Sequence, residues 1–288
     1  MFFVGVEYGR GAQKTPIDYG CEKGPFEIKK LYPNENWTLL TPSWSFNREE
    51  CERDRFSENL KIQEIIYNFF KDKDENFITN HLFFGGDHSL NFAHFKAIAD
   101  HFENEDIALI YIDAHLDIHT PQSSQAEASG SPHGTNVRHL LGEGDNRFLN
   151  LGGKSRVALR PENLFYIGTR SYEPSEIDFV KHQNIFTTDG NDVNNIKYID
   201  DVITKIKSKI GNKKYVISID FDGISPSEFD AVQVPELGGI SLSTMEHILP
   251  LLRSPNLIAT EFVEYAPSFD KIGTSQKVVK SIIDNFVK

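Results

Sequence analysis

The stretch Ile107-Ala108-Leu109-Ile110-Tyr111-Ile112 is followed directly by Asp113-Ala114-His115-Leu116-Asp117. The first six residues are apolar without interruption and rich in β-branched and aromatic types, which predicts a buried strand. Asp113, His115 and Asp117 stand at i, i+2 and i+4, so on an extended or gently turning backbone their side chains point the same way. This stretch therefore predicts a buried strand with polar, chemically active side chains at its carboxyl end.

Similar apolar runs recur along the chain and alternate with segments of helical spacing. We predict further strands at Phe2–Val6, Leu82–Phe84, Leu164–Ile167, Tyr215–Ile219 and Leu257–Phe262, and helices at Asn59–Phe70, Leu90–Phe102, Tyr198–Ile210 and Gln276–Phe286. Strands that are apolar throughout indicate a mostly parallel sheet covered on both faces. We therefore expect one α/β domain over residues 1–288, built as a three-layer α/β/α sandwich with a mostly parallel central sheet.

Composition excludes several classes of protein. The 288 residues carry a formal net charge of -12, which disfavours binding to nucleic acid. Cys21 and Cys51 are the two cysteines and have no metal-type spacing, so we expect a reducing compartment and no structural disulfide. The N-terminus lacks the pattern of a signal peptide and no apolar run could span a bilayer. We expect a soluble cytoplasmic protein that binds no membrane.

Three predicted strands end in the same kind of motif. Gly85-Gly86-Asp87-His88-Ser89 and Asp220-Phe221-Asp222 join the segment that begins at Asp113. Parallel strands bring their carboxyl ends to one edge, so six side chains converge there, and so many negative charges need a cation to offset their repulsion. The six candidate ligands are His88, Asp113, His115, Asp117, Asp220 and Asp222. Carboxylate and imidazole groups without thiolate favour manganese over zinc, and their number favours two bridged ions.

These three motifs resemble the signatures of the ureohydrolases, the family of arginase, agmatinase and formiminoglutamase. The resemblance extends from Gly24-Pro25 to Glu264-Tyr265-Ala266-Pro267. It implies a binuclear manganese hydrolase of guanidino or amidino groups, in which hydroxide held between the metals is the nucleophile. One ion would be held by His88, Asp113, Asp117 and Asp220, and the other by Asp113, His115, Asp220 and Asp222, with Asp113 and Asp220 bridging. Members of the family are commonly trimers or hexamers, so the resemblance implies a homo-oligomer.

The resemblance also implies roles in catalysis and in substrate binding. We assign catalytic roles to His133 as proton shuttle, to Asp117, and to Glu264, which would accept hydrogen bonds from the guanidinium nitrogens. His119, Ser129, Glu173, Glu176 and Glu264 are the predicted substrate contacts. Two alternatives stay open: His133 could be a surface loop histidine, and Glu173-Pro174-Ser175-Glu176 could be an ordinary helix start.

The loop Asp117-Ile118-His119-Thr120-Pro121 and the pattern Ser129-Gly130-x-x-His133-Gly134 are more similar to arginase than to agmatinase, so L-arginine is the first choice of substrate. The chain departs from the arginases at His119 and Ser131, where Asn is usual, and over Ser225–Pro235. Agmatine, formiminoglutamate and other guanidino acids therefore remain alternative substrates. A homologue that binds metal but has lost catalysis, serving a regulatory or structural role, is the alternative of another class.

Four histidines on predicted helices carry no assigned chemistry. They are His94, His101, His139 and His247. We expect them to be at the surface or half-buried.

Overall fold

The computed structural model describes residues 1–11, 20–44, 48–124, 130–154, 156–188, 190 and 192–287. Its centre is one eight-stranded sheet in the order β2-β1-β3-β8-β7-β4-β5-β6, and all of its neighbouring strands pair in parallel. The strands are β1 (Phe2–Val6), β2 (Asn36–Leu40), β3 (His81–Phe84), β4 (Ala108–Ile112), β5 (Leu164–Ile167), β6 (Phe186–Thr187), β7 (Tyr215–Asp220) and β8 (Leu257–Val263).

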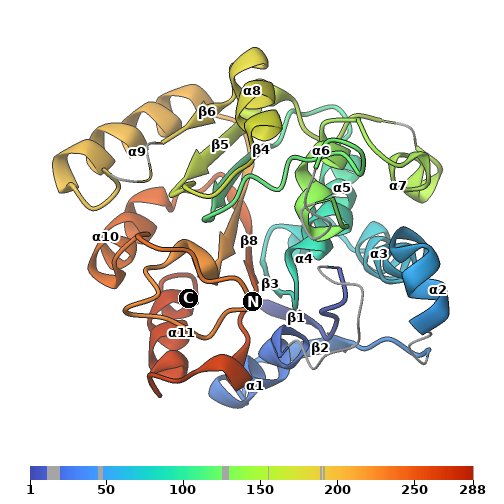
Figure 1. Cartoon of the computed structure of the whole chain (residues 1–288), viewed down its shortest axis with the longest axis horizontal. Coiled ribbons are helices and arrows are strands. Elements are labelled where there is room, and N and C mark those ends of the chain that lie inside the picture. The colour runs from blue at the N-terminus through green and yellow to red at the C-terminus, as the bar shows by residue number, and fades with distance from the viewer. Residues whose placement is uncertain are drawn as a thin grey trace.

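Helices cover both faces of this sheet (Figure 1). The α-helices are α1 (Gly24–Leu31), α2 (Arg48–Arg53), α3 (Arg55–Lys71), α4 (Glu75–Ile78), α5 (Asn91–His101), α6 (Asn136–Leu140), α7 (Asn146–Leu149), α8 (Pro174–His182), α9 (Ile196–Ile210), α10 (Leu242–Leu252) and α11 (Ser275–Asp284). Short 3₁₀ helices lie at Cys21–Lys23, His88–Leu90, His133–Thr135, Leu151–Gly153, Pro161–Asn163, Phe221–Gly223 and Pro267–Phe269. The predicted three-layer α/β/α class is confirmed.

Side chains alternate along each strand and so build two cores. On β4, Ile110 and Ile112 face a core shared with α1, α9, α10 and α11. Leu109 and Tyr111 face the opposite core, to which α3, α5, α6 and α8 contribute. Both faces of the central strands are therefore buried, which explains why these strands are apolar at every position.

Helix α9 illustrates how local sequence sets the outer layers. The side chain of Asn195 accepts a hydrogen bond from the backbone N–H of Tyr198, which caps the first turn. The buried residues of this helix are Ile199, Val202, Ile203, Ile206 and Ile210. This spacing lays one apolar stripe on the sheet. Gly211 ends the helix with φ 60°, a conformation that glycine adopts without strain.

The six predicted strands and four predicted helices are all present, with ends shifted by a few residues. Two strands were not predicted. They are β2, whose five residues are all partly or fully exposed, and β6, which has two residues. Both lie at the edges of the sheet, where a strand needs no continuous apolar run.

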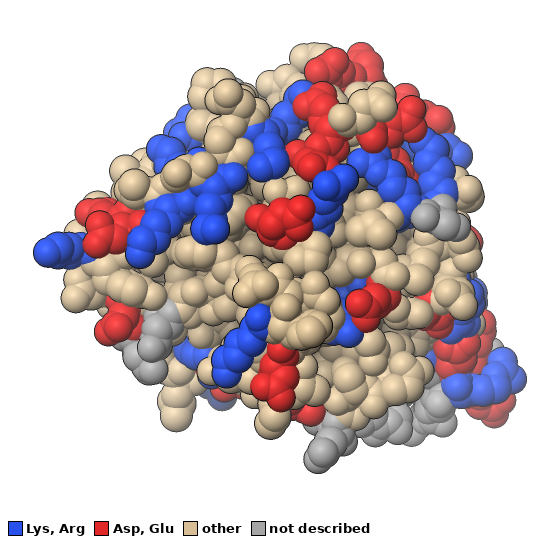
Figure 2. All heavy atoms as spheres, turned by 90° about the horizontal axis from the view of Figure 1, so that it is seen from above, with Lys and Arg blue, Asp and Glu red and all other residues tan. Residues whose placement is uncertain are grey.

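Two surface properties bear on possible partners. Among the residues that the structure describes, no helix combines the length and apolar character that crossing a membrane requires. On the face seen in Figure 2, Lys and Arg side chains lie among Asp and Glu side chains instead of forming one basic surface.

Replacing Ile110 by Ala tests the buried central strand. Ile110 is 1% exposed, so we expect the free energy of unfolding to fall by about 2–5 kcal/mol because a cavity replaces the side chain. Chemical denaturation followed by circular dichroism measures the change. Ile196→Ala on α9 is the matched control, since Ile196 is 46% exposed and its loss should cost less than about 1 kcal/mol. Equal losses at both positions would contradict the layered core.

Candidate metal centre and active site

The candidate ligands lie where β3, β4 and β7 end. The loop after β3 passes so close to the N-terminal segment that a Cβ on Gly86 would lie 1.9 Å from the carbonyl oxygen of Tyr8. Glycine is therefore required there, and the close approach places the next residues, Asp87 and His88, over the carboxyl edge of the sheet. The candidate ligands predicted from the sequence lie close together at this edge.

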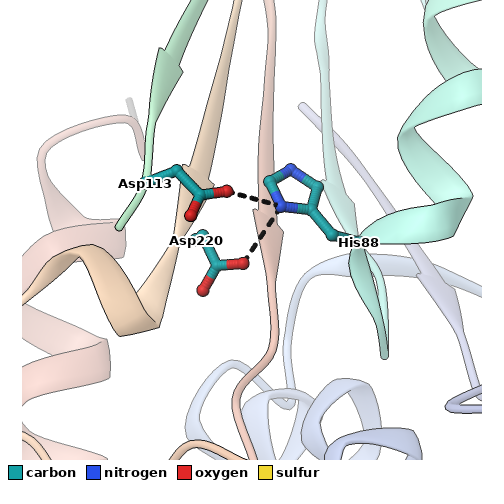
Figure 3. Close-up of side chains that lie close together, drawn as sticks. All are labelled: His88, Asp113 and Asp220. Carbon is teal, nitrogen blue, oxygen red and sulfur yellow. Dashed lines mark hydrogen bonds and ion pairs between the residues drawn. The ribbon is translucent and has the colours of Figure 1, made fainter. Parts of the chain in front are cut away.

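His88 is the centre of the first ligand group. Its Nδ1 lies 3.0 Å from Asp113 Oδ2 and 3.0 Å from Asp220 Oδ2. Figure 3 shows both carboxylates pointing at this nitrogen from the ends of neighbouring strands. All three side chains are buried, and their donor atoms lie within 4.8 Å of one another, so they could hold one metal ion.

His115 is the centre of the second group. Its Nδ1 lies 3.0 Å from Asp222 Oδ2 and 3.5 Å from Asp113 Oδ1. These three residues form a second set of candidate ligand atoms within 4.8 Å. Asp113 belongs to both groups, as expected for a bridging carboxylate, whereas Asp220 belongs to the first group alone.

Backbone N–H groups orient the aspartates. Asp113 Oδ1 accepts from His115 N at 2.6 Å, Asp220 Oδ1 accepts from Asp222 N at 2.7 Å, and Asp222 Oδ1 accepts from Ala114 N at 3.2 Å. In each residue the other oxygen, Oδ2, faces an imidazole. The backbone thus holds these carboxylates in place in the absence of a metal ion.

Asp117 lies beside the first group but outside both sets. Its Oδ2 is 3.4 Å from His88 Nδ1 and accepts hydrogen bonds from the Tyr111 hydroxyl at 2.9 Å and from Asn136 Nδ2 at 3.0 Å. Tyr111 also stacks flat on the His88 ring, with the centroids 4.4 Å apart. Tyr111 therefore positions both Asp117 and His88, and Asn136 positions Asp117, roles that were not predicted.

Burial and mutual repulsion raise the pKa of several of these acids. Burial and the Asp113 charge raise the pKa of Asp117 to about 7, and burial together with Asp222 and Asp113 raises that of Asp220 well above its usual value. Burial opposes a charge on His88, but its contacts with Asp113 and Asp220 outweigh this and raise its pKa. Asp113 is the exception: burial opposes its charge, but its contacts with His115 and His88 outweigh this and lower its pKa. Without a cation, the raised pKa values of the other acids and of His88 therefore favour protonated forms that bind metal poorly.

The donor set fits divalent cations. It combines imidazole nitrogen with carboxylate oxygen and includes no thiolate, as manganese and similar ions prefer. Asp113 Oδ2 is buried, and its one close polar neighbour among the described residues is His88 Nδ1, itself a candidate ligand atom, at 3.0 Å. A cation between the two groups would coordinate this oxygen and offset the repulsion that raises the pKa values.

A cavity of about 110 Å³ opens beside the two ligand groups. Its lining includes four of the predicted ligands, His115, Asp117, Asp220 and Asp222, together with His133, Glu264, His119 and Glu176. The structure thus brings together the predicted ligands and four residues predicted to act in catalysis or substrate binding.

Two cavity residues are held firmly by the backbone. Glu264 Oε1 accepts the backbone N–H of His88 at 2.9 Å, so this carboxylate is tied to the first ligand group. His133 donates its backbone N–H to Gly11 O at 3.3 Å, and its carbonyl accepts from Asn136 Nδ2 at 2.6 Å. His133 is therefore a partly buried residue of the cavity wall.

The predicted substrate contacts cluster at the start of α8. His119 Nε2 lies 3.1 Å from Glu176 Oε2 and 3.5 Å from Glu173 Oε1. Glu176 Oε2 also accepts the backbone N–H of Glu173, which is a contact that caps the start of a helix. Glu176 therefore also has the helix-start role that was left open as the alternative. Ser129 lies outside the described residues.

Sequence reasoning missed Glu236 and Arg170. Glu236 Oε1 lies 3.5 Å from His115 Nε2, at the side of the ring away from Asp222. The Arg170 guanidinium donates to the carbonyl groups of Asp222 and Glu236 at 2.8 and 3.1 Å and so joins two loops of the site. Glu236 follows no predicted strand, and Arg170, although it comes three residues after the predicted strand Leu164–Ile167, belongs to no motif that was recognised there. Its position at a strand end was the one signal that could have found it.

The raised pKa values predict that metal binding releases protons. The pKa of Asp117 is raised to about 7 and that of His88 is raised above its usual value, so near pH 7 both groups release protons when they bind a cation. We expect affinity for Mn²⁺ to rise as the pH rises from 6 to 8. Isothermal titration calorimetry of the metal-free protein in buffers of different ionisation enthalpy measures the protons released. A binding enthalpy that is the same in all buffers would contradict these pKa shifts.

Comparisons with known proteins bear on the family of this chain. The family model described as the Arginase family matches residues 2–287. Arginase from Staphylococcus aureus (strain COL) is 31% identical over 209 residues, 71% of this chain and 66% of that protein, so the matched region spans slightly less than two thirds of that relative.

Two solved structures share the fold. Arginase from Bacillus subtilis subsp. subtilis str. 168 superimposes with a TM-score of 0.84 at 22% identity, covering 99% of this chain and 97% of that chain. Formimidoylglutamase from the same organism gives a TM-score of 0.72 at 18% identity, covering 99% and 84%. With the family model matching nearly the whole chain, the protein belongs to the arginase family.

Proposed function

We propose that the protein hydrolyses the guanidino group of L-arginine to urea and L-ornithine, using two Mn²⁺ ions held by His88, Asp113, His115, Asp117, Asp220 and Asp222. One observation carries this proposal: the same small cavity is lined by members of both ligand groups, by Glu264 and by His133. Membership of the arginase family supports the class of reaction.

The cations would supply nucleophilic hydroxide near neutral pH by lowering the pKa of water. The protein's own residues have three tasks. Glu264 would accept N–H groups of the guanidinium, which stays charged at any relevant pH and presents paired donors to a carboxylate. The His88 N–H already fixes the position of this carboxylate at the cavity wall.

His133 would deliver a proton to the leaving amine. Its backbone is held at both its N–H and its carbonyl, and the residue lines the cavity beside Glu264. A general acid must reach the leaving group, and these contacts fix the backbone that carries the His133 side chain at the cavity.

His119, Glu176 and Glu173 would bind the far end of the substrate. His119 can donate to an α-carboxylate, while the two glutamates match the positive α-amino group. Because Glu176 lines the cavity and also contacts His119, it connects substrate recognition to the start of α8. Arginine carries both groups, whereas agmatine lacks the carboxylate, which supports arginine as the substrate.

The single-domain organisation, the cytoplasmic location and the homo-oligomeric assembly remain predictions. They follow from composition and from the family resemblance.

A substrate panel tests the proposed function. Urea release by the Mn²⁺-loaded protein is measured with arginine, agmatine, formiminoglutamate, guanidinobutyrate and guanidine. We expect the largest kcat/KM with arginine and a value at least about 100-fold lower with agmatine, because its binding would leave the groups that recognise the α-carboxylate unpaired. A preference for another member of the panel would overturn the choice of substrate, and a metal-loaded protein inactive on all would support a non-catalytic role.

Replacing His133 by Ala tests the proton shuttle. We expect kcat to fall by about 10²- to 10⁴-fold while both metal ions remain bound, since His133 contributes proton transfer and is not a ligand. Elemental analysis of the purified variant measures the metal content, and urea release measures turnover. A variant that loses its metal along with its activity would show that the assigned role is wrong.

A further inference from the structure

A line of buried polar side chains leads from His88 away from the cavity and into the core. It passes through Ser218, Glu261, His94 and His81, and each of the five residues is at most 2% exposed. His94 was predicted at the surface or half-buried, which is wrong, as it is for His139. Burying polar groups is costly unless their hydrogen bonds are satisfied, so each contact along this line needs a donor hydrogen and an acceptor.

We propose that Glu261 is a positioning residue that acts through Ser218 to keep His88 in the tautomer that can bind a metal ion. The inference rests on the proposed function, because it concerns the metal ligand His88. It extends that function to residues of the core that do not line the cavity.

The first step concerns the His88 ring. Its Nδ1 faces Asp113 and Asp220, and its Nε2 lies 2.8 Å from Ser218 Oγ. A cation bound at Nδ1 requires that the single hydrogen of the neutral ring be on Nε2, where it is donated to Ser218 Oγ. The Ser218 hydroxyl must then send its own hydrogen elsewhere.

Glu261 is the acceptor for that hydrogen. It pairs with Ser218 in the register of β7 and β8, so the two residues lie side by side. Glu261 Oε1 is buried and accepts no hydrogen bond from the described residues as they lie, which leaves it open to a turn of the Ser218 hydroxyl. Burial raises the pKa of Glu261 to about 8 and Ser218 lowers it, which reflects how near the two groups are.

The other oxygen of Glu261 is fixed by two histidines. His94 Nδ1 lies 2.8 Å from Glu261 Oε2, the Nε2 atoms of His94 and His81 are 2.7 Å apart, and His81 Nδ1 is 2.9 Å from Ile78 O. These three contacts need three hydrogens, and two neutral imidazoles supply two. A neutral carboxylic acid at Glu261 supplies the third, so that every contact is satisfied without a buried charge. Burial lowers the pKa of both histidines, in agreement with neutral rings.

This arrangement selects one tautomer of His88. Without an acceptor at Glu261, the Ser218 hydroxyl could turn and donate to His88 Nε2. The ring hydrogen would then be on Nδ1, the position that the cation needs. Glu261 therefore favours the metal-binding form without touching the metal.

The test compares two substitutions of Glu261 in the metal-free protein titrated with Mn²⁺ by calorimetry. Glu261→Gln keeps a carbonyl oxygen for Ser218 and supplies an N–H to His94, so it reproduces the neutral acid. We expect its Mn²⁺ affinity to remain within about threefold of wild type. Glu261→Leu removes both functions, and we expect affinity to fall by about 10- to 100-fold, as when the partner of a metal-ligating histidine is lost.

Asp100→Leu is the matched control. Asp100 is also a buried acid, hydrogen-bonded by Tyr67 and Lys96, but it lies outside the line. Its loss should lower the thermal unfolding temperature of the metal-free protein and leave Mn²⁺ affinity unchanged. Circular dichroism of each variant shows whether it is folded.

Ser218→Ala is a second variant that keeps the acid and its histidines in place. We expect the same loss of affinity as for Glu261→Leu, and no further loss when both changes are combined, because the two residues act in series. Wild-type affinity in Ser218→Ala, or in a folded Glu261→Leu protein, would overturn the positioning role. A wild-type protein that takes up no Mn²⁺ would instead contradict the proposed function.

Discussion

The main physical constraint on this structure is that several acidic side chains, which repel one another when ionised, are buried at one place. Asp113, Asp117, Asp220, Asp222 and Glu264 are at most 6% exposed and lie at the same edge of the sheet. Raised pKa values of most of these groups express the energetic cost of this arrangement. Hydrophobic packing cannot relieve such a cost, whereas positive charge can. The imidazoles of His88 and His115, whose pKa values the acids raise, supply part of that charge, and bound cations would supply the rest.

The parallel sheet is what brings these groups together. Asp113 follows β4 and Asp220 is the last residue of the adjacent strand β7, although the two are far apart in the chain. In a parallel sheet all carboxyl ends lie at one edge, so each ligand loop needs only to follow its strand. The two cores on either face then fix the strands, and therefore the ligands, with respect to one another.

Much of this could be predicted from the sequence, because strands buried on both faces and ligands directly after them leave clear local patterns. Contacts made across the fold leave none. The exposure of His94 could not be inferred from its helix, since its partner Glu261 lies on a distant strand. Glu236 contacts His115 from a separate loop, and no pattern in the sequence links the two residues. The edge strand β2 lacks the continuous apolar run that identified the six predicted strands.

Two acids of this site lie in a strained backbone conformation that lowers stability. In the described part of the chain, three residues other than glycine have a positive φ, and two of them line the cavity: Asp117 at 50° and Glu264 at 65°. Such conformations cost on the order of 1–3 kcal/mol and persist where surrounding contacts impose them. Glu264 N donates to Gly86 O at 2.7 Å, and Asp117 O accepts from Val137 N at 3.1 Å. Glycine would relieve the strain at both positions, so the acids stand there for their carboxylates, at the expense of stability.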